Sequence, residues 1–166
     1  RRFEEDSHQP RPERLSDGLR EPYGAYVNLR VAGRLRGRAA YPLSSAPLWS
    51  CVRALAIRAA FEDARFSPVK QEELPGLEVQ ISVLGAPKKV SDPESIELGR
   101  DGLMIRRGER LGVLLPGAAV EHGWSRAEFL AQACQSAGLA PDAWKESDVT
   151  IYSFQATVFS EKELDL

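Results

Sequence analysis

Residues 34–41 carry three arginines, Arg34, Arg36 and Arg38, which alternate with small or apolar residues. Successive side chains of a β-strand point to opposite faces, so this pattern predicts that the three guanidinium groups share one face. A guanidinium is a planar fork of donors that binds carboxylates or phosphates at two points. The segment therefore indicates a site for an anionic small molecule or an acidic partner loop. The alternative is a solvated strand face with locally paired arginines.

Two further groups carry charge at turn-like positions. Asp63 and Arg65 either lie at a binding cleft or hold a turn that ends a helix, and the turn is the favoured interpretation. Asp101 is a candidate general base, although an Asp-Gly pair before a strand also forms a turn. Glu78 is a second candidate for moving a proton beside an arginine.

The composition limits the classes of function. The chain has 166 residues, which suits one domain, or one domain with a small lobe. Its 24 acidic and 22 basic residues nearly balance, which argues against a dedicated nucleic-acid binder. No apolar run is long enough to cross a bilayer and no signal peptide opens the sequence, so we expect a cytoplasmic protein without a membrane partner.

The thiols and imidazoles give no pattern typical of a metal site. Cys51 and Cys134 fall in helix-like segments, which favours two buried reduced thiols over a disulfide. There is no Cys-x-x-Cys pair, and His8 and His122 are far apart, so we expect no metal. Glycine-rich phosphate loops with the required spacing are absent, and we expect no cofactor.

Hydrophobic periodicity predicts the order of the elements. Residues 1–22 are polar and proline-containing, which predicts a tail or linker before a domain at 23–160, with a short tail at 161–166. Alternation predicts strands, and helical spacing predicts helices. The predicted strands are residues 25–31, 34–41, 77–84, 103–106, 111–115 and a long final strand at 149–159, and the predicted helices are residues 47–63 and a segment from 125 that stops at Gly138. Strands and helices mix without regular alternation, which predicts an α+β fold whose mixed, mainly antiparallel sheet is flanked by helices.

The first hairpin has two plausible registers. A two-residue loop at Ala32 and Gly33 pairs Leu29 with Arg36 and mixes polar and apolar faces. A three-residue loop pairs Leu29 with Leu35 and keeps one face apolar, so it is the predicted register.

A series of short phrases, in order, carries a resemblance to a known family. They are Tyr-Gly-Ala-Tyr-Val at 23–27, Leu-Arg-Gly at 35–37, Ala-Ala-Phe-Glu-Asp-Ala-Arg-Phe at 59–66, Glu-Leu at 73–74 with Leu-Glu-Val-Gln-Ile-Ser-Val-Leu at 77–84, Gly-Arg-Asp-Gly-Leu at 99–103, Gly-Val-Leu-Leu-Pro at 112–116, Gly-Trp at 123–124 with Phe-Leu at 129–130, and Ala-Gly-Leu-Ala-Pro-Asp-Ala-Trp at 137–144. Over roughly residues 23–159 the chain resembles the AMME chromosomal region (AMMECR) domain family. In bacteria, members of that family look like component A of a system that also has a Memo-like protein and a radical-SAM protein.

The resemblance implies an α+β fold with a larger and a smaller lobe, and a candidate site at the family motif Leu-Arg-Gly-Cys-Ile-Gly. It implies no established activity. Leu35, Arg36 and Gly37 match the motif, whereas Arg38 stands where the family has its Cys. If that Cys is a nucleophile, this chain lacks it, because an arginine is neither a nucleophile nor a base at neutral pH.

Three functions follow as hypotheses. The first is an accessory module that binds an anionic small ligand or a protein partner through Arg36 and Arg38, with Arg34, Gly37, Arg65 and Asp63 nearby, beside the Memo-like and radical-SAM proteins that the resemblance implies. The second is an enzyme that pairs Arg36 with Asp101 or Glu78. The third is nucleic-acid binding through a basic strand face with Tyr26 and Tyr41 for stacking.

Overall fold

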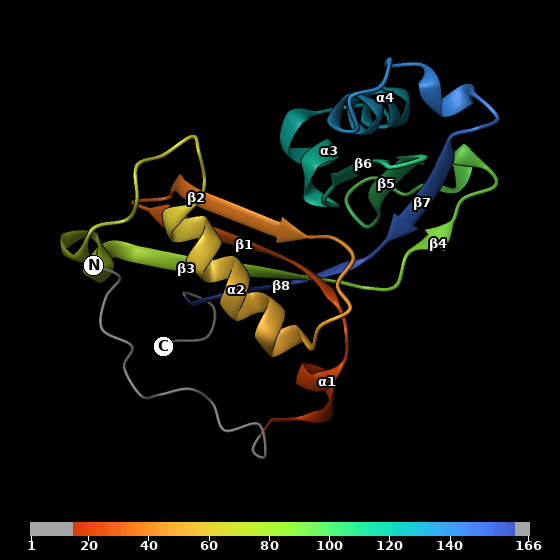
Figure 1. The fold of residues 1–166 in the computed structure, drawn as a ribbon. Coiled ribbons are helices and arrows are strands. Elements are labelled where there is room, and N and C mark those ends of the chain that lie inside the picture. Colours follow the sequence, from red (N-terminus) through yellow and green to blue (C-terminus); the bar gives the residue numbers. More distant parts are fainter. Residues whose placement is uncertain (1–14, 162–166) are drawn as a thin grey trace. The chain divides into compact units, whose positions relative to one another are not determined.

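The computed structural model describes residues 15–161, so most of the two expected tails lies outside the described residues. The chain divides into two compact units. Among the described residues, the first unit contains residues 15–83 and 158–161, and the second unit contains residues 84–157 (Figure 1). Each unit has its own buried apolar cluster.

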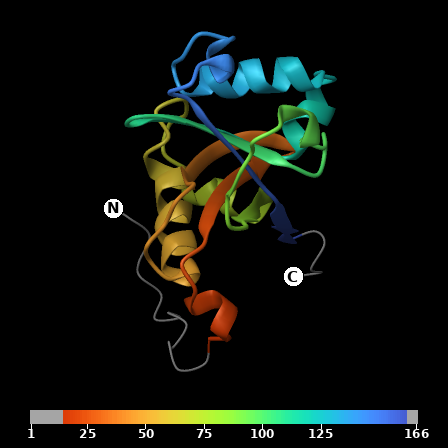
Figure 2. The same ribbon diagram turned by 90° about the vertical axis from the view of Figure 1, so that its right-hand side faces the viewer.

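The first unit is built on a four-stranded sheet with the order β2-β1-β3-β8. Its strands are β1 (Gly24–Val31), β2 (Arg34–Tyr41), β3 (Leu77–Leu84) and β8 (Ala156–Ser160), and its helical segments are α1 (Asp17–Arg20), α2 (Leu48–Phe61) and the 3₁₀ helix η2 (Gln71–Gly76). Helix α2 lies across one face of the sheet, beside β1, as Figures 1 and 2 both show. Its buried residues recur at helical spacing because one stripe of the helix covers the sheet; they are Leu48, Cys51, Leu55 and Ala59.

The β1–β2 hairpin differs from the predicted register. The loop has two residues, Ala32 and Gly33, which both have positive φ angles (49° and 75°), as a tight hairpin turn requires. A β-bulge then shifts the pairing, so that Leu29 lies opposite Gly37 instead of Leu35. Arg36 is the extra residue of the bulge. The prediction of a three-residue loop was wrong. The bulge keeps polar and apolar side chains on separate faces of the hairpin, so the turn does not need a third residue.

The second unit also has a four-stranded sheet, with the order β4-β7-β5-β6. Its elements are β4 (Lys88–Lys89), η3 (Pro93–Ser95), β5 (Gly102–Arg107), β6 (Arg110–Leu114), α3 (Gly117–His122), α4 (Arg126–Ser136), η4 (Ala143–Lys145) and β7 (Thr150–Phe154). Phe129 and Leu130 of α4 are buried with Leu103 and Ile105 of β5. Figure 2 shows α4 along one side of these strands.

The predicted final strand is two strands in the structure. Residues 149–159 were expected to form one long strand, but the ladder breaks at Gln155 between β7 and β8. β7 belongs to the second sheet and β8 to the first. The Gln155 carbonyl accepts a hydrogen bond from the Gly85 backbone N–H at 2.8 Å. The segment is rich in β-branched and aromatic residues and has no glycine or proline, so the sequence does not mark the change of sheet.

The structure confirms the α+β fold and the remaining predicted elements to within a few residues. Helix α1 lies in the range expected to be a tail, and the Glu21 carbonyl that follows it accepts a bond from the Leu48 N–H at 2.9 Å. Within residues 15–161, no helix combines the length and hydropathy needed to span a membrane.

Candidate functional site

Arg36, the residue at the bulge, is held by the segment that follows α2. Its Nε donates to Glu73 Oε1 at 2.6 Å and its Nη2 donates to Glu73 Oε2 at 3.0 Å. Its terminal nitrogens also donate to the Ser67 and Pro68 carbonyls, at 2.8 and 3.3 Å. These bonds lower the pKa of Glu73 to about 2, first through the Arg36 hydrogen bond and then through the Lys70 backbone N–H. Arg36 therefore clamps residues 67–73 onto the end of the hairpin.

Asp63 and Arg65 form the turn that ends α2. Arg65 Nε and Nη2 donate to the two Asp63 carboxylate oxygens at 2.9 and 2.7 Å. Asp63 Oδ2 also accepts from the Arg38 backbone N–H at 2.8 Å, which ties the turn to β2. The Arg65 bonds and these backbone N–H groups hold the pKa of Asp63 well below its usual range. Asp63 and Arg65 therefore hold the turn together. The turn lies directly beside Arg38, whose backbone N–H it binds.

Arg38 differs from these two arginines because it has no carboxylate partner. Its Nε donates to Asn28 Oδ1 at 2.7 Å, and its Nη1 and Nη2 make no hydrogen bond to any residue in the range 15–161. Partial burial lowers its pKa first, and the positive charges of Arg65 and Arg30 lower it further. The residue as a whole is exposed. Arg38 is therefore a cation with spare donors beside other cations.

Gly37 has a packing role. Its residue is buried, and a Cβ added there would overlap the carbonyl oxygen of Ala59 in α2 and lie 3.0 Å from the carbonyl carbon. The absence of a side chain lets β2 approach the helix closely. Gly37 thus allows β2 to lie close to α2. The turn at Asp63 follows α2 in the chain.

The remaining predicted residues lie apart from this group or at its margin. Arg34 is exposed at the start of β2, opposite Val31, and its side chain makes no hydrogen bond to a described residue. Glu78 is half-buried on β3. Asp101 belongs to the second unit, where Arg100 donates to both of its oxygens at 2.9 Å and the Glu97 N–H donates to Oδ2. The carboxylate that pairs with Arg36 is Glu73, so the structure does not show the predicted pairing with Asp101 or Glu78.

Sequence reasoning missed three residues of this region: Asn28, Gln80 and Glu73. Asn28 is 3% exposed, and its Nδ2 donates to Gln80 Oε1 at 3.3 Å. A lone amide between Val27 and Leu29 in a buried strand was the available signal. Glu73 had no such signal, because it lies 37 residues from Arg36.

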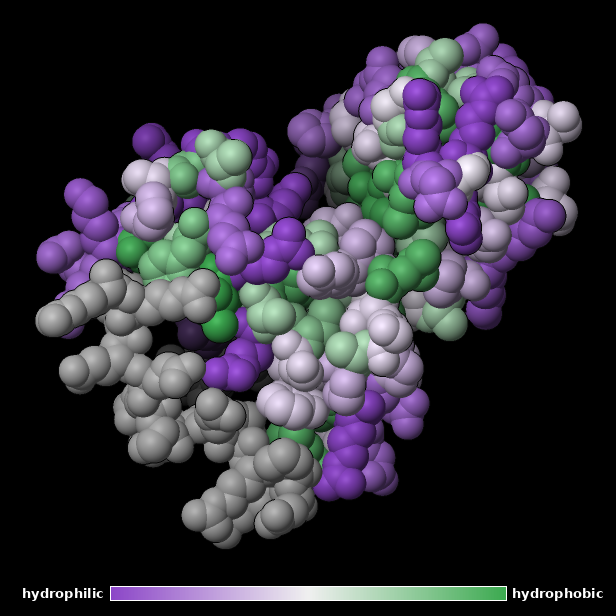
Figure 3. Space-filling model, in the orientation of Figure 1, coloured by the Kyte–Doolittle hydropathy of each residue, from purple (hydrophilic) through white to green (hydrophobic). Residues whose placement is uncertain are grey.

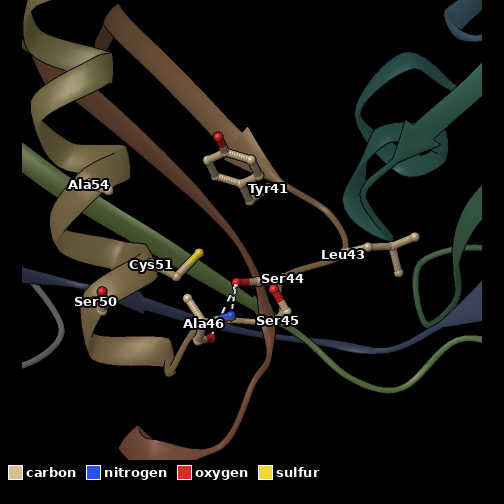
Figure 4. Close-up of a pocket in the computed structure, with 8 residues that line it drawn as sticks. All are labelled: Tyr41, Leu43, Ser44, Ser45, Ala46, Ser50, Cys51 and Ala54. Carbon is tan, nitrogen blue, oxygen red and sulfur yellow. Dashed lines mark hydrogen bonds between the residues drawn. The ribbon is translucent and has the colours of Figure 1, made fainter.

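A separate hollow of about 310 Å³ lies where β2 leads into α2. It is lined by Tyr41, Leu43, Ser44, Ser45, Ala46, Ser50, Cys51 and Ala54 (Figure 4). Ser44 Oγ accepts from the Ala46 N–H at 3.1 Å, which shapes the loop before the helix. The lining side chains carry hydroxyl and thiol groups but no charge. In Figure 3 the visible surface around α2 is a mixture of pale, green and purple residues.

The two cysteines are buried, and His122 packs against an aromatic ring. Cys51 and Cys134 are both free and buried, at 4% and 0% exposure. Burial raises the pKa of Cys134. The His122 ring stacks on Trp124, with centroids 4.4 Å apart. Among the described residues, no three His, Cys, Asp or Glu side chains come together in a way that would hold a metal ion.

The protein has an α+β fold with two four-stranded sheets, each packed against a helix. The Leu-Arg-Gly phrase lies on β2 of the first sheet. The AMMECR1 family model matches residues 1–159, and the chain therefore belongs to the AMMECR1 family. This confirms the resemblance traced from residue 23, and the match begins further upstream, at residue 1.

Individual relatives support the same conclusion. A protein of Pyrococcus furiosus is 40% identical over 161 residues, which cover 91% of this chain and 77% of that protein. A protein of Aquifex aeolicus is 38% identical over 159 residues, which cover 92% of this chain and 82% of that protein. The crystal structure of an uncharacterized protein from Pyrococcus horikoshii superposes with a TM-score of 0.84 at 38% identity, covering 91% of this chain and 79% of the other.

Proposed function

We propose that this chain is a binding module that captures an anionic small molecule at Arg38. The observation that carries the proposal is the pair of Arg38 terminal nitrogens, which make no hydrogen bond to any residue from 15 to 161. A guanidinium is more weakly hydrated than an ammonium, so an acceptor readily replaces its water, and a planar oxyanion fits two of its donors at once. Arg30 adds positive charge nearby, whereas the charge of Arg65 is paired with Asp63.

The neighbouring arginines support the choice of Arg38. Arg36 is committed to Glu73, and Arg65 is committed to Asp63, each through a two-point ion pair. An anion that displaced either carboxylate would leave that carboxylate beside it and unpaired. No carboxylate among residues 15–161 is bonded to Arg38 Nη1 or Nη2, so an anion bound there would displace none.

Binding is favoured over acid–base catalysis by the state of the carboxylates. The pKa values of Glu73, Asp63 and Asp101 are all lowered by hydrogen bonds from arginine. A carboxylate with a lowered pKa is a weak base at neutral pH and cannot supply a proton there. Within this proposal, the Memo-like and radical-SAM proteins implied by the family resemblance are the companions beside which the module acts.

The experiment is a titration of the ¹⁵N-labelled protein with sodium malonate and with sodium phosphate at low ionic strength, followed by NMR of the arginine Nε–Hε signals. The Arg38→Gln variant is compared with Arg34→Gln, which removes the same charge from the same strand. A charge-assisted hydrogen bond contributes roughly 1.5–3 kcal/mol, so Arg38→Gln is expected to weaken binding by about tenfold or more. Arg34→Gln is expected to bind like the wild type.

Two results would overturn the proposal. One is the absence of saturable shifts in the wild-type protein. The other is an equal loss in both variants, which would mean that the anion responds to the diffuse charge of β2 and not to a site.

A further inference from the structure

A chain of two side-chain hydrogen bonds crosses three neighbouring strands of the first unit. Arg38 on β2 donates from Nε to Asn28 Oδ1 on β1 at 2.7 Å, and Asn28 donates from Nδ2 to Gln80 Oε1 on β3 at 3.3 Å. Arg38 and Asn28 are direct cross-strand partners in the ladder. Val27 and Leu29 pack in the cluster that α2 covers, so alternation places Asn28 on the opposite face.

The direction of each bond in this chain follows from chemistry. A guanidinium only donates, so Asn28 must turn its oxygen toward Arg38. Its NH₂ group must then face β3, where only an acceptor satisfies it, and this orients the Gln80 oxygen toward Asn28. The Gln80 NH₂ group consequently points away from Asn28. It makes no hydrogen bond to any other residue of the described range.

Burial makes this arrangement difficult to break. Asn28 is 3% exposed, so water has little access to its amide. Leaving a buried polar group without a partner costs roughly 1–3 kcal/mol. Asn28 thus holds the Arg38 guanidinium by its Nε and leaves the Nη1–Nη2 edge for a ligand, while the Gln80 oxygen on β3 holds Asn28 in this orientation.

The local charge limits the kind of oxyanion. Glu73 neutralises Arg36 and Asp63 neutralises Arg65, whereas no carboxylate among residues 15–161 bonds to the side chain of Arg38. One guanidinium edge with a neutral amide donor matches a singly charged, planar group better than a doubly charged phosphate.

Taking the anion site at Arg38 as given, we propose that its ligand is a carboxylate, and that Asn28 and Gln80 are positioning residues that build a donor array around it. Asn28 orients the Arg38 edge without touching the ligand. Gln80 fixes the orientation of Asn28 with its oxygen and offers its Nε2 amide toward the same face.

The decisive variant is Gln80→Glu. It keeps an oxygen that accepts from Asn28, so the chain of bonds persists, but it replaces the outward NH₂ donor by a negative oxygen. Gln135→Glu is the matched control, because it makes the same change at an exposed position of α4 in the second unit. Gln80→Met, which has similar length and no charge, is the second variant should Gln80→Glu unfold, and thermal unfolding reports on this for each variant.

Sodium acetate and sodium phosphate are titrated at equal ionic strength, with the Arg38 Nε–Hε signal identified by its absence in Arg38→Gln. We expect Gln80→Glu to weaken acetate binding by at least fivefold and Gln135→Glu to change it by less than twofold. We expect Asn28→Asp, which turns the Arg38 contact into an ion pair, to weaken it at least as much while the Hε proton stays hydrogen-bonded.

The outcomes separate the two proposals. Loss of acetate binding in Arg38→Gln with wild-type affinity in Gln80→Glu and Gln80→Met would overturn the donor array and leave the anion site standing. Phosphate binding more tightly than acetate would overturn the assignment of a carboxylate. If Arg38→Gln binds acetate and phosphate like the wild type, the anion site itself fails and the array fails with it.

Discussion

Arg36 and Glu73 are joined at two points, by Nε to Oε1 at 2.6 Å and by Nη2 to Oε2 at 3.0 Å, across 37 residues of chain. Glu73 Oε2 also accepts from the Lys70 backbone N–H at 2.8 Å. This one carboxylate therefore closes the loop after α2 onto β2 and caps the start of η2. The ion pair therefore occupies the donors of Arg36, the arginine that matches the Leu-Arg-Gly motif of the family.

Replacing Glu73 with Gln is expected to make stability less dependent on pH in acid. The pKa of Glu73 falls from its ordinary value of 4.5 to about 2, so the folded state favours the ionised carboxylate. Its stabilising contribution is complete above an unfolded-state pKa of about 4.5 and is lost as the pH falls toward 2. Thermal unfolding from neutral pH downward should show a gap between wild type and Glu73→Gln that narrows through this window.

The neighbouring exposed Glu72 provides the control for that measurement. Glu72→Gln should unfold like the wild type across the same pH range. A gap for Glu73→Gln that stays constant as the solution is acidified would contradict the ion pair.

The substitution Gly37→Ala is expected to destabilise the first unit. The new methyl group would overlap the Ala59 carbonyl oxygen, and neither backbone segment can move freely. Overpacking of this kind costs roughly 1–3 kcal/mol. Gly76→Ala is the control, since a Cβ there meets nothing within 4 Å. Urea unfolding of the two variants should separate them, and equal midpoints would show that β2 does not need to lie so close to α2.

Removal of the Ser125 hydroxyl should weaken the start of α4. Ser125 and Glu128 form a capping box, in which Ser125 Oγ accepts from the Glu128 N–H and Glu128 accepts from the Ser125 N–H. Loss of such a cap costs roughly 0.5–2 kcal/mol. Ser125→Ala is therefore expected to lower the unfolding midpoint, whereas the same change at exposed Ser91 should leave it in place. A similar midpoint for the two would argue against the cap.

The two thiols are expected to differ in reactivity under native conditions. Cys51 lines the hollow at the end of β2, whereas Cys134 is 0% exposed and burial raises its pKa. The thiolate is the reactive form, so a raised pKa slows alkylation at any given pH below it. Iodoacetamide should modify Cys51 first, and both should react quickly in guanidinium chloride; mass spectrometry of peptides measures the order. Modification of Cys134 first in the folded protein would be inconsistent with this packing.

The element boundaries were largely predictable because they depend on local patterns. Alternation of apolar residues located β2 and β3 at their observed ends, and helical spacing located α2 to within two residues. The capping box placed the start of α4 for the same reason, since its two members are only three residues apart. The family resemblance likewise depended on short local phrases.

The site could be predicted only in part. The arginine-rich strand pointed to the correct region, but strict alternation failed at the bulge, where Arg36 is the extra residue. Which arginine keeps free donors depends on Glu73, which lies 37 residues from Arg36, and on Asn28, which lies 10 residues from Arg38. The split between β7 and β8 was missed in the same way, because periodicity shows which face is apolar but not which sheet the strand joins.

Side-chain periodicity reports the face that each residue presents, because it follows from the backbone geometry of a few consecutive residues. The chain of amino acids was therefore sufficient for the helices, the strands and the family. Ion pairs and amide orientations are settled by whichever groups meet after distant segments have packed. In this way Arg36 bonds to a carboxylate and Arg38 bonds to an amide. No local pattern contains this difference, and it locates the proposed anion site.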